Sequence, residues 1–234
     1  MITHFLMALG QGTAEAVAQT PPIKEELSFS LISMAFKGGW IMLPLLVLSI
    51  IALYIFGERW WAIRKASQID QNFMKNIHDF IYDGKIKAAV NLCKSQETPI
   101  ARLIEKGIER IGRPLNDIQT SVENMGNLEI SRLEKGLPML ATIAGGAPML
   151  GFLGTVIGMI QAFYNMSQAG SNVDITLLSG GIYTAMVTTV AGLTVGILAY
   201  FGYNYLTARI DNIVYKMESN TIEFMDLLHE PAGK

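Results

Sequence analysis

Four threonines could carry chemistry in this chain, because they lie on or beside stripes of small side chains in two long apolar runs. Thr155 lies in one run, and Thr184, Thr188 and Thr189 lie in the next. A threonine hydroxyl donates one hydrogen bond and can accept two, so a row of them could contact water or an ionisable group. The simpler alternative is that each hydroxyl bonds to a carbonyl one turn earlier in its own helix. We interpret the four as a polar lining at a helix interface.

The two runs contain no group of their own that could take up and release a proton. Between Lys135 and Arg209 the only charged residue is Asp174, which lies in the short connection between the runs. If the hydroxyls serve a proton-carrying carboxylate, that carboxylate must come from another polypeptide. No acid, base and nucleophile converge in these runs either, so we do not expect an enzyme.

Small side chains recur every three or four residues in both runs and form one stripe along each. In lipid, such stripes let helix backbones approach closely, and packing drives helix association there. We therefore expect two tightly packed helices. The stripe residues are Gly151, Gly154 and Gly158 in the first run, and Gly181, Ala185, Gly192 and Gly196 in the second.

Composition indicates an all-α integral membrane protein. Hydrophobic residues make up 50% of the chain and charged residues 16%, whereas soluble domains have about 25% charged residues. Each run exceeds the roughly 20 residues that cross a bilayer. A third apolar run has Trp40 at one end and Trp60 and Trp61 at the other, positions that aromatic side chains favour at membrane interfaces. The sequence therefore predicts three transmembrane helices, extended by a cytoplasmic helical bundle.

Lysine and arginine set the expected orientation, because they cluster in the long central segment and are absent from the connection between the second and third spans. We expect the N-terminus to be periplasmic and the C-terminus cytoplasmic. Along the chain, the expected order is an exported extension with an interfacial helix (1–37), the first span (38–57), a cytoplasmic helical region (58–136), the second span (137–164), an exported turn (165–176), the third span (177–205) and a cytoplasmic tail (206–234).

The exported extension has two open interpretations. An Ala-Val-Ala before Gln19 is typical of a cleavable signal peptide, but no lysine or arginine precedes the short apolar stretch. The alternative is a disordered exported segment that ends at Pro21 and Pro22.

Charge and cysteine content exclude several other classes of protein. The net charge of −2 and the lack of a basic patch with stacking aromatics do not fit a nucleic-acid partner. The single Cys93 has no histidine or second cysteine at metal-ligand spacing, so we expect a small buried apolar residue there. No metal or cofactor is expected.

Several segments of the sequence resemble those of a known protein family. The segment ATIAGGAPMLGFLGTVIGMIQAF (141–163) is similar to the second membrane helix of the MotA/TolQ/ExbB proton channel family, and GGIYTAMVTTVAGLTVGILAYFGYN (180–204) to its third. The similarity extends to ERWWAIRK after the first span and to LCKSQETPIARLIEKGIERI in the cytoplasmic segment. The ExbB and TolQ branch resembles the chain most.

The resemblance implies an energy-coupling subunit of the bacterial inner membrane that forms a homo-oligomer, a pentamer in that family. It implies a single-span partner of ExbD/TolR type whose membrane Asp carries the proton, and a TonB-type protein that transmits force to the outer membrane. Thr155 and Thr189 match family residues that line the proton route. Thr184 stands where the family commonly has a glutamate, so the carboxylate role cannot be transferred to this chain.

The sequence is also compatible with two other functions. A flagellar-type stator subunit is one, although that family usually has four spans and a larger charged cytoplasmic region. A membrane scaffold that stabilises a partner without conducting protons is the other. Proton flux measured with and without the partner separates conduction from scaffolding.

Overall fold

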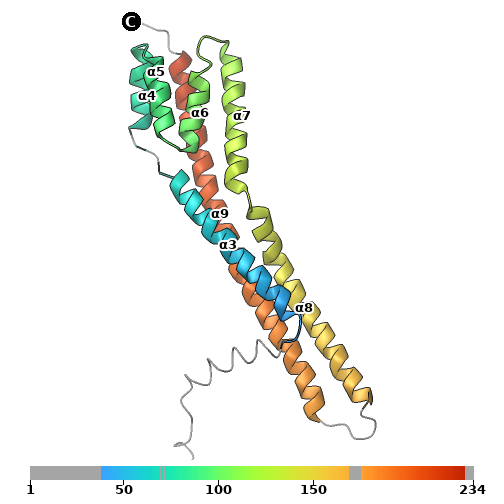
Figure 1. Ribbon diagram of the computed structural model, residues 1–234. Coiled ribbons are helices and arrows are strands. Elements are labelled where there is room, and N and C mark those ends of the chain that lie inside the picture. Colours follow the sequence, from blue (N-terminus) through green and yellow to red (C-terminus); the bar gives the residue numbers. More distant parts are fainter. Residues whose placement is uncertain (1–37, 69, 71, 169–174, 230–234) are drawn as a thin grey trace, which may run out of the picture. The chain divides into compact units, whose positions relative to one another are not determined.

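The computed structural model describes residues 38–68, 70, 72–168 and 175–229, and every regular element in these ranges is a helix (Figure 1). The expected exported extension at 1–37, with its interfacial helix and its signal-peptide alternative, lies outside the described residues, as do 169–174 of the expected turn and the last five residues. The elements are α3 (Met42–Ala66), α4 (Phe73–Tyr82), α5 (Ile86–Ser95), α6 (Pro99–Ile108), α7 (Leu115–Glu134), α8 (Leu137–Gln168) and α9 (Ile175–His229).

Three helical stretches are long and apolar enough to cross a membrane: Met42–Ala66, Leu115–Gln168 and Leu178–His229. The prediction of an all-α membrane protein with three spans is therefore confirmed. The helices also continue well past their apolar parts. The first continues through Glu58 and Arg59 to its end, and α9 has 55 residues, although about 20 suffice to span a bilayer.

The chain divides into two compact units. The described residues of the first are 38–44, 152–168 and 175–191, and those of the second are 45–151 and 192–229. In the first unit, the second half of α8 packs against the first part of α9. In the second unit, the short helices α4 to α7 connect α3 to the first half of α8, and the remainder of α9 runs alongside them (Figure 1).

Glycine and proline residues separate the short helices. Gly84 and Gly112 have φ angles of +71° and +95°, which end one helix and turn the chain into the next. Pro99 is the first residue of α6, and the Thr98 side chain caps that helix by accepting a hydrogen bond from the Ala101 amide at 3.3 Å. The helices α4, α5, α6 and α7 then pack each against the next.

The core of the second unit is apolar and includes the end of α9. Phe73, Ile77 and Ile104 have at most 1% of their surface exposed. Phe224, near the C-terminal end of α9, is fully buried, and its ring lies against Gly107 of α6, where even a methyl group would collide with it. This contact attaches the end of α9 to the short helices.

Candidate functional site

The small-residue stripes of α8 and α9 face each other in the first unit. A Cβ added to Gly158 would lie 2.9 Å from the Cβ of Ala185, and one added to Gly181 would lie 2.5 Å from that of Ala162. Real Cβ atoms do not approach so closely, so no larger residue fits at these positions without a shift of the helices. The two backbones are in direct contact here, as packing in lipid requires.

Glycines also allow α8 and α9 to approach closely in the second unit. A Cβ on Gly192 would lie 2.6 Å from the carbonyl oxygen of Ala147 and within 3.0 Å of the backbone of Gly151. A Cβ on Gly196 would lie 2.5 Å from Pro148. The obstacle at Gly192 is backbone, which cannot move aside as a flexible side chain could.

The hydroxyls of Thr155, Thr184 and Thr188 bond to their own helices. The hydroxyls of Thr155 and Thr188 each donate to a carbonyl three residues earlier, and that of Thr184 donates to the carbonyl four residues earlier at 3.0 Å. The local alternative that the sequence left open is therefore what the structure shows for these residues. A hydroxyl that donates in this way still presents acceptor lone pairs to a neighbouring group.

The four threonines differ in how deeply they are buried. The side chain of Thr188 has 1% of its surface exposed, because it packs against Gly154, where a Cβ would collide with it. Thr155, Thr184 and Thr189 are half-buried. Within one chain, Thr188 belongs to the helix contact, while the other three are in positions that a second polypeptide could reach.

Thr155 opens on a groove of α8 with a volume of about 470 Å³. The remaining lining is almost entirely apolar and comprises Val156, Met159, Ile160 and Phe163. Thr155 is therefore the one polar side chain among the residues that line this groove.

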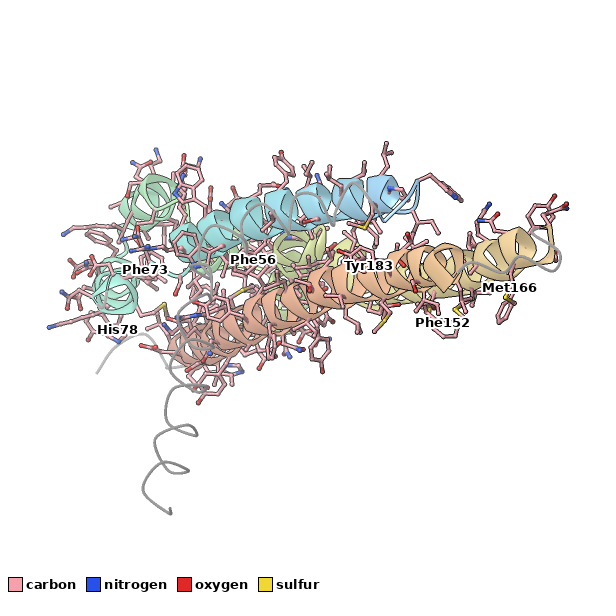
Figure 2. The ribbon with its side chains drawn as sticks, turned by 90° about the horizontal axis from the view of Figure 1, so that it is seen from below. Phe56, Phe73, His78, Phe152, Met166 and Tyr183 are labelled. Carbon is pink, nitrogen blue, oxygen red and sulfur yellow. The ribbon has the colours of Figure 1, made fainter. Side chains whose placement is uncertain are left out.

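Large apolar side chains cover the outside of the first unit. Phe152 of α8 and Tyr183 of α9, both labelled in Figure 2, are 67% and 40% exposed. Ile160, Met186 and Val190 each have more than 60% of their surface exposed. Apolar side chains exposed in such number are covered by lipid or by another protein chain.

Ionisable clusters of metal-binding type do not occur in the described part of the chain, where no three His, Cys, Asp or Glu side chains come together. The single cysteine, Cys93, is buried at 1% exposure. Burial raises the pKa of its thiol to about 12, and the nearby Glu105 carboxylate adds to the shift. Such a thiol is unreactive at neutral pH.

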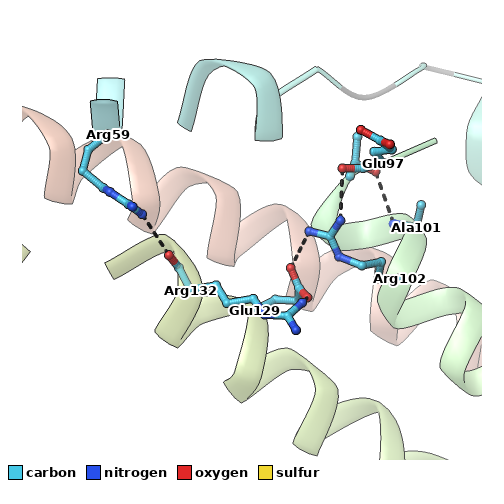
Figure 3. A network of polar contacts seen from close by, with 7 residues as sticks. Arg59, Glu97, Ala101, Arg102, Glu129 and Arg132 are labelled. Atoms are coloured by element: carbon cyan, nitrogen blue, oxygen red, sulfur yellow. Dashed lines mark hydrogen bonds and ion pairs between the residues drawn. The ribbon is translucent and has the colours of Figure 1, made fainter. Parts of the chain in front are cut away.

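One polar network was not foreseen from the sequence. Glu129 of α7 has 1% of its surface exposed and lies between the guanidinium groups of Arg102 and Arg132 (Figure 3). Arg59 of α3 donates to the Arg132 carbonyl at 3.1 Å. The network connects α3, α6 and α7.

The comparison with protein families decides the class of this helical arrangement. The family model of the MotA/TolQ/ExbB proton channels matches residues 95–219, more than half of the chain. The chain belongs to the MotA/TolQ/ExbB proton channel family. The match includes all four candidate threonines and both small-residue stripes, and the family comprises proton channel subunits rather than a known class of enzyme.

Relatives within this family carry ExbB and TolQ names. The chain is 28% identical to an ExbB homologue of Methanothermobacter thermautotrophicus, over 81% of this chain and 67% of that one. It is 25% identical to the biopolymer transport protein ExbB of Neisseria meningitidis, over 75% and 86% of the two chains. It is 36% identical to the Tol-Pal system protein TolQ of Haemophilus influenzae, over 45% and 46%. This family member is therefore similar to both ExbB and TolQ.

Proposed function

We propose that this chain is the channel-forming subunit of an energy-coupling complex in the bacterial inner membrane. It forms a homo-oligomer, a pentamer, around the single membrane helices of an ExbD/TolR-type partner, with its N-terminus periplasmic and its C-terminus cytoplasmic. The complex uses the proton motive force to energise TonB-dependent outer-membrane transport or envelope maintenance. Support comes from family membership and from relatives named for biopolymer transport and the Tol-Pal system.

The observation that carries the proposal is that the spans contain hydroxyl groups but no charged residue. From 136 to 208 the sequence has one charged residue, Asp174, outside the spans, while Thr155, Thr184 and Thr189 are half-buried on spans with apolar exteriors. The partner's membrane Asp therefore supplies the titratable group. This chain supplies the hydroxyl-bearing surface.

A threonine hydroxyl can serve both protonation states of such an Asp. When the acid is protonated, the Thr155 hydroxyl accepts a hydrogen bond from the acid's O–H and keeps donating to the Phe152 carbonyl of its own helix. When the acid is ionised, rotation of the hydroxyl about the Cβ–Oγ1 bond lets the same group donate to the carboxylate. One proton crossing a 100 mV potential releases about 2.3 kcal/mol, so mechanical work requires repeated transfers.

The test is proton flux into vesicles that contain the chain together with its single-span partner. Thr155→Val and Thr189→Val keep the shape but remove the hydroxyl. Each variant should lower the flux at least about tenfold, because a hydrogen bond to a charged group contributes roughly 1.5–3 kcal/mol.

Thr142→Val is the matched control, since Thr142 also lies on α8, is exposed and donates to the Pro138 carbonyl at 2.8 Å. Its flux should equal that of the unmodified protein. Unchanged flux in both the Thr155 and Thr189 variants would remove the lining role. Absence of flux from the unmodified complex, with the partner bound, would identify a scaffold instead.

A further inference from the structure

A cavity of about 360 Å³ lies between α3 and α9 in the second unit. Its lining is almost wholly apolar and includes Leu53 and Phe56 of α3 and Leu198 of α9. Phe56 (Figure 2) lies against Gly202, where an added Cβ would be 3.0 Å from the ring. The glycine lets the ring settle between the helices, and the cavity that remains is narrow and apolar.

A second cavity of about 570 Å³ follows along the same two helices and is polar. Arg64 of α3 and Arg209 and Lys216 of α9 line it, and no acidic side chain does so among the described residues. Tyr205 lines both cavities. The two cavities therefore adjoin at one side chain, with the apolar part on one side of it and the basic part on the other.

Aromatic rings hold both arginines in place. The Arg64 guanidinium lies 5.5 Å from the centre of the Trp60 ring, and that of Arg209 lies 5.4 Å from the Tyr205 ring. Arg209 also donates to the Tyr205 hydroxyl at 3.3 Å. Cation–π contacts position the two cations without neutralising them, so their charge remains available to an anion.

The pair of cavities sits where the apolar parts of α3 and α9 end. Tryptophan and tyrosine favour the headgroup level of a bilayer, and Trp60 and Tyr205 mark that level here. The apolar cavity then lies at the depth of the acyl chains and the basic cavity at the depth of the headgroups. Basic pockets between membrane helices at this level bind anionic headgroups.

We propose that these cavities form one binding site for an anionic phospholipid such as phosphatidylglycerol. The phosphate lies between Arg64 and Arg209, with Lys216 beside it, and one acyl chain enters the cavity next to Phe56. Guanidinium groups suit this role because they bind phosphate oxygens through two parallel hydrogen bonds. The site is separate from the threonine-bearing surface and does not depend on the proposed function.

Four possible occupants differ in which of the two cavities they need. Free inorganic phosphate and an acidic peptide use only the basic cavity. A zwitterionic lipid fills the apolar cavity, but its choline or ethanolamine group offsets the attraction of three cations. An anionic phospholipid needs both cavities at once, and the experiment exploits this requirement.

The experiment measures quenching of Trp60 fluorescence in the full-length protein with Trp40→Phe and Trp61→Phe. The protein is placed in phosphatidylcholine nanodiscs that contain increasing fractions of phosphatidylglycerol or phosphatidylcholine brominated on the acyl chains. Brominated phosphatidylglycerol should quench at a clearly lower mole fraction. Arg64→Gln and Arg209→Gln should each reduce that preference about fivefold, since one interfacial cation contributes about 1 kcal/mol.

Arg113→Gln is the control, because Arg113 is an exposed arginine between α6 and α7, outside both cavities. It should leave the preference unchanged. Ser49→Phe places a ring into the apolar cavity, which Ser49 lines, and should abolish the preference while both arginines remain. Millimolar inorganic phosphate should not compete.

Equal quenching by the two lipids in the unmodified protein would overturn the proposal, because the site would then hold only bulk lipid. Displacement of phosphatidylglycerol by inorganic phosphate or by an acidic peptide, with no effect of Ser49→Phe, would also overturn it. The phosphatidylglycerol that remains after purification in detergent is a second measure that needs no substitution. It should exceed that of a phosphatidylcholine-exchanged sample several-fold.

Discussion

Arg102 and Glu129 form an ion pair between α6 and α7 in which the carboxylate is sealed from solvent. Arg102 Nη2 lies 2.6 Å from Glu129 Oε2, and the Glu129 side chain has 1% of its surface exposed (Figure 3). Arg132 occupies the other carboxylate oxygen at 2.5 Å. A buried carboxylate needs such partners, because an unpaired charge in the interior is costly. The pair therefore fixes how α7 packs on α6.

Glu129→Gln should lower the stability of the second unit by about 1–3 kcal/mol, because it leaves two arginines without their carboxylate. The estimate is at the lower end for buried pairs, since Arg102 and Arg132 are themselves partly exposed. The measurement is thermal unfolding of the detergent-purified protein. Glu109→Gln removes an exposed pair with Lys106 at 3.2 Å, and its effect should be under about 1 kcal/mol. Equal effects of both substitutions would contradict the structural role.

Phe224→Ala should release the end of α9 from the short helices. The ring is fully buried against Gly107, and truncation of a buried phenylalanine costs about 3–5 kcal/mol. Hydrogen exchange in the last turns of α9 should become faster. Ile222→Ala is the control, because Ile222 is 63% exposed on the same helix, and it should leave exchange there nearly unchanged.

Gly192→Ala should disturb the contact between α8 and α9 in the second unit. The new methyl would lie 2.6 Å from the Ala147 carbonyl oxygen, and overpacking of this kind costs roughly 1–3 kcal/mol. Gly145→Ala serves as control, because an added Cβ there meets no atom within 4 Å. The melting temperature should fall for the first and stay level or rise for the second, since alanine favours helix.

Cys93 should react slowly with a thiol reagent at pH 8. A pKa of about 12 leaves only about one thiol in ten thousand ionised at that pH, and 1% exposure restricts access further. The folded protein should be labelled at least about a hundredfold more slowly than the same chain in denaturant. Because the folded pKa lies above the ordinary value of 9.0, this thiol contributes stability below pH 9 that is lost as the pH rises toward 12.

The membrane spans and the helix breaks could be predicted from the sequence, because both depend on local chemistry. A segment that crosses lipid must satisfy its own backbone hydrogen bonds and carry apolar side chains, so a run without charges suffices to identify it. The breaks at Gly84 and Pro99 follow from the conformations that these residues allow. Family membership was also predictable, since it rests on sequence similarity.

The candidate site could be predicted only in part. The positions of the threonines and the glycines are visible as a pattern, but their burial is not. Thr188 and Thr189 are neighbours in sequence, yet Thr188 is buried against Gly154 and Thr189 is half-buried, because successive residues of a helix point in different directions.

Sequence alone therefore established that this is a three-span helical protein whose spans carry hydroxyls and no acid, since hydropathy and the lack of a titratable residue are properties of the chain itself. Tertiary structure decided which side chains meet. Glu129 is buried because Arg102, 27 residues earlier, and Arg132 reach it. Arg64 and Arg209 line one cavity because α3 and α9 pack side by side. Contacts between distant segments depend on how the helices pack, which no local pattern encodes.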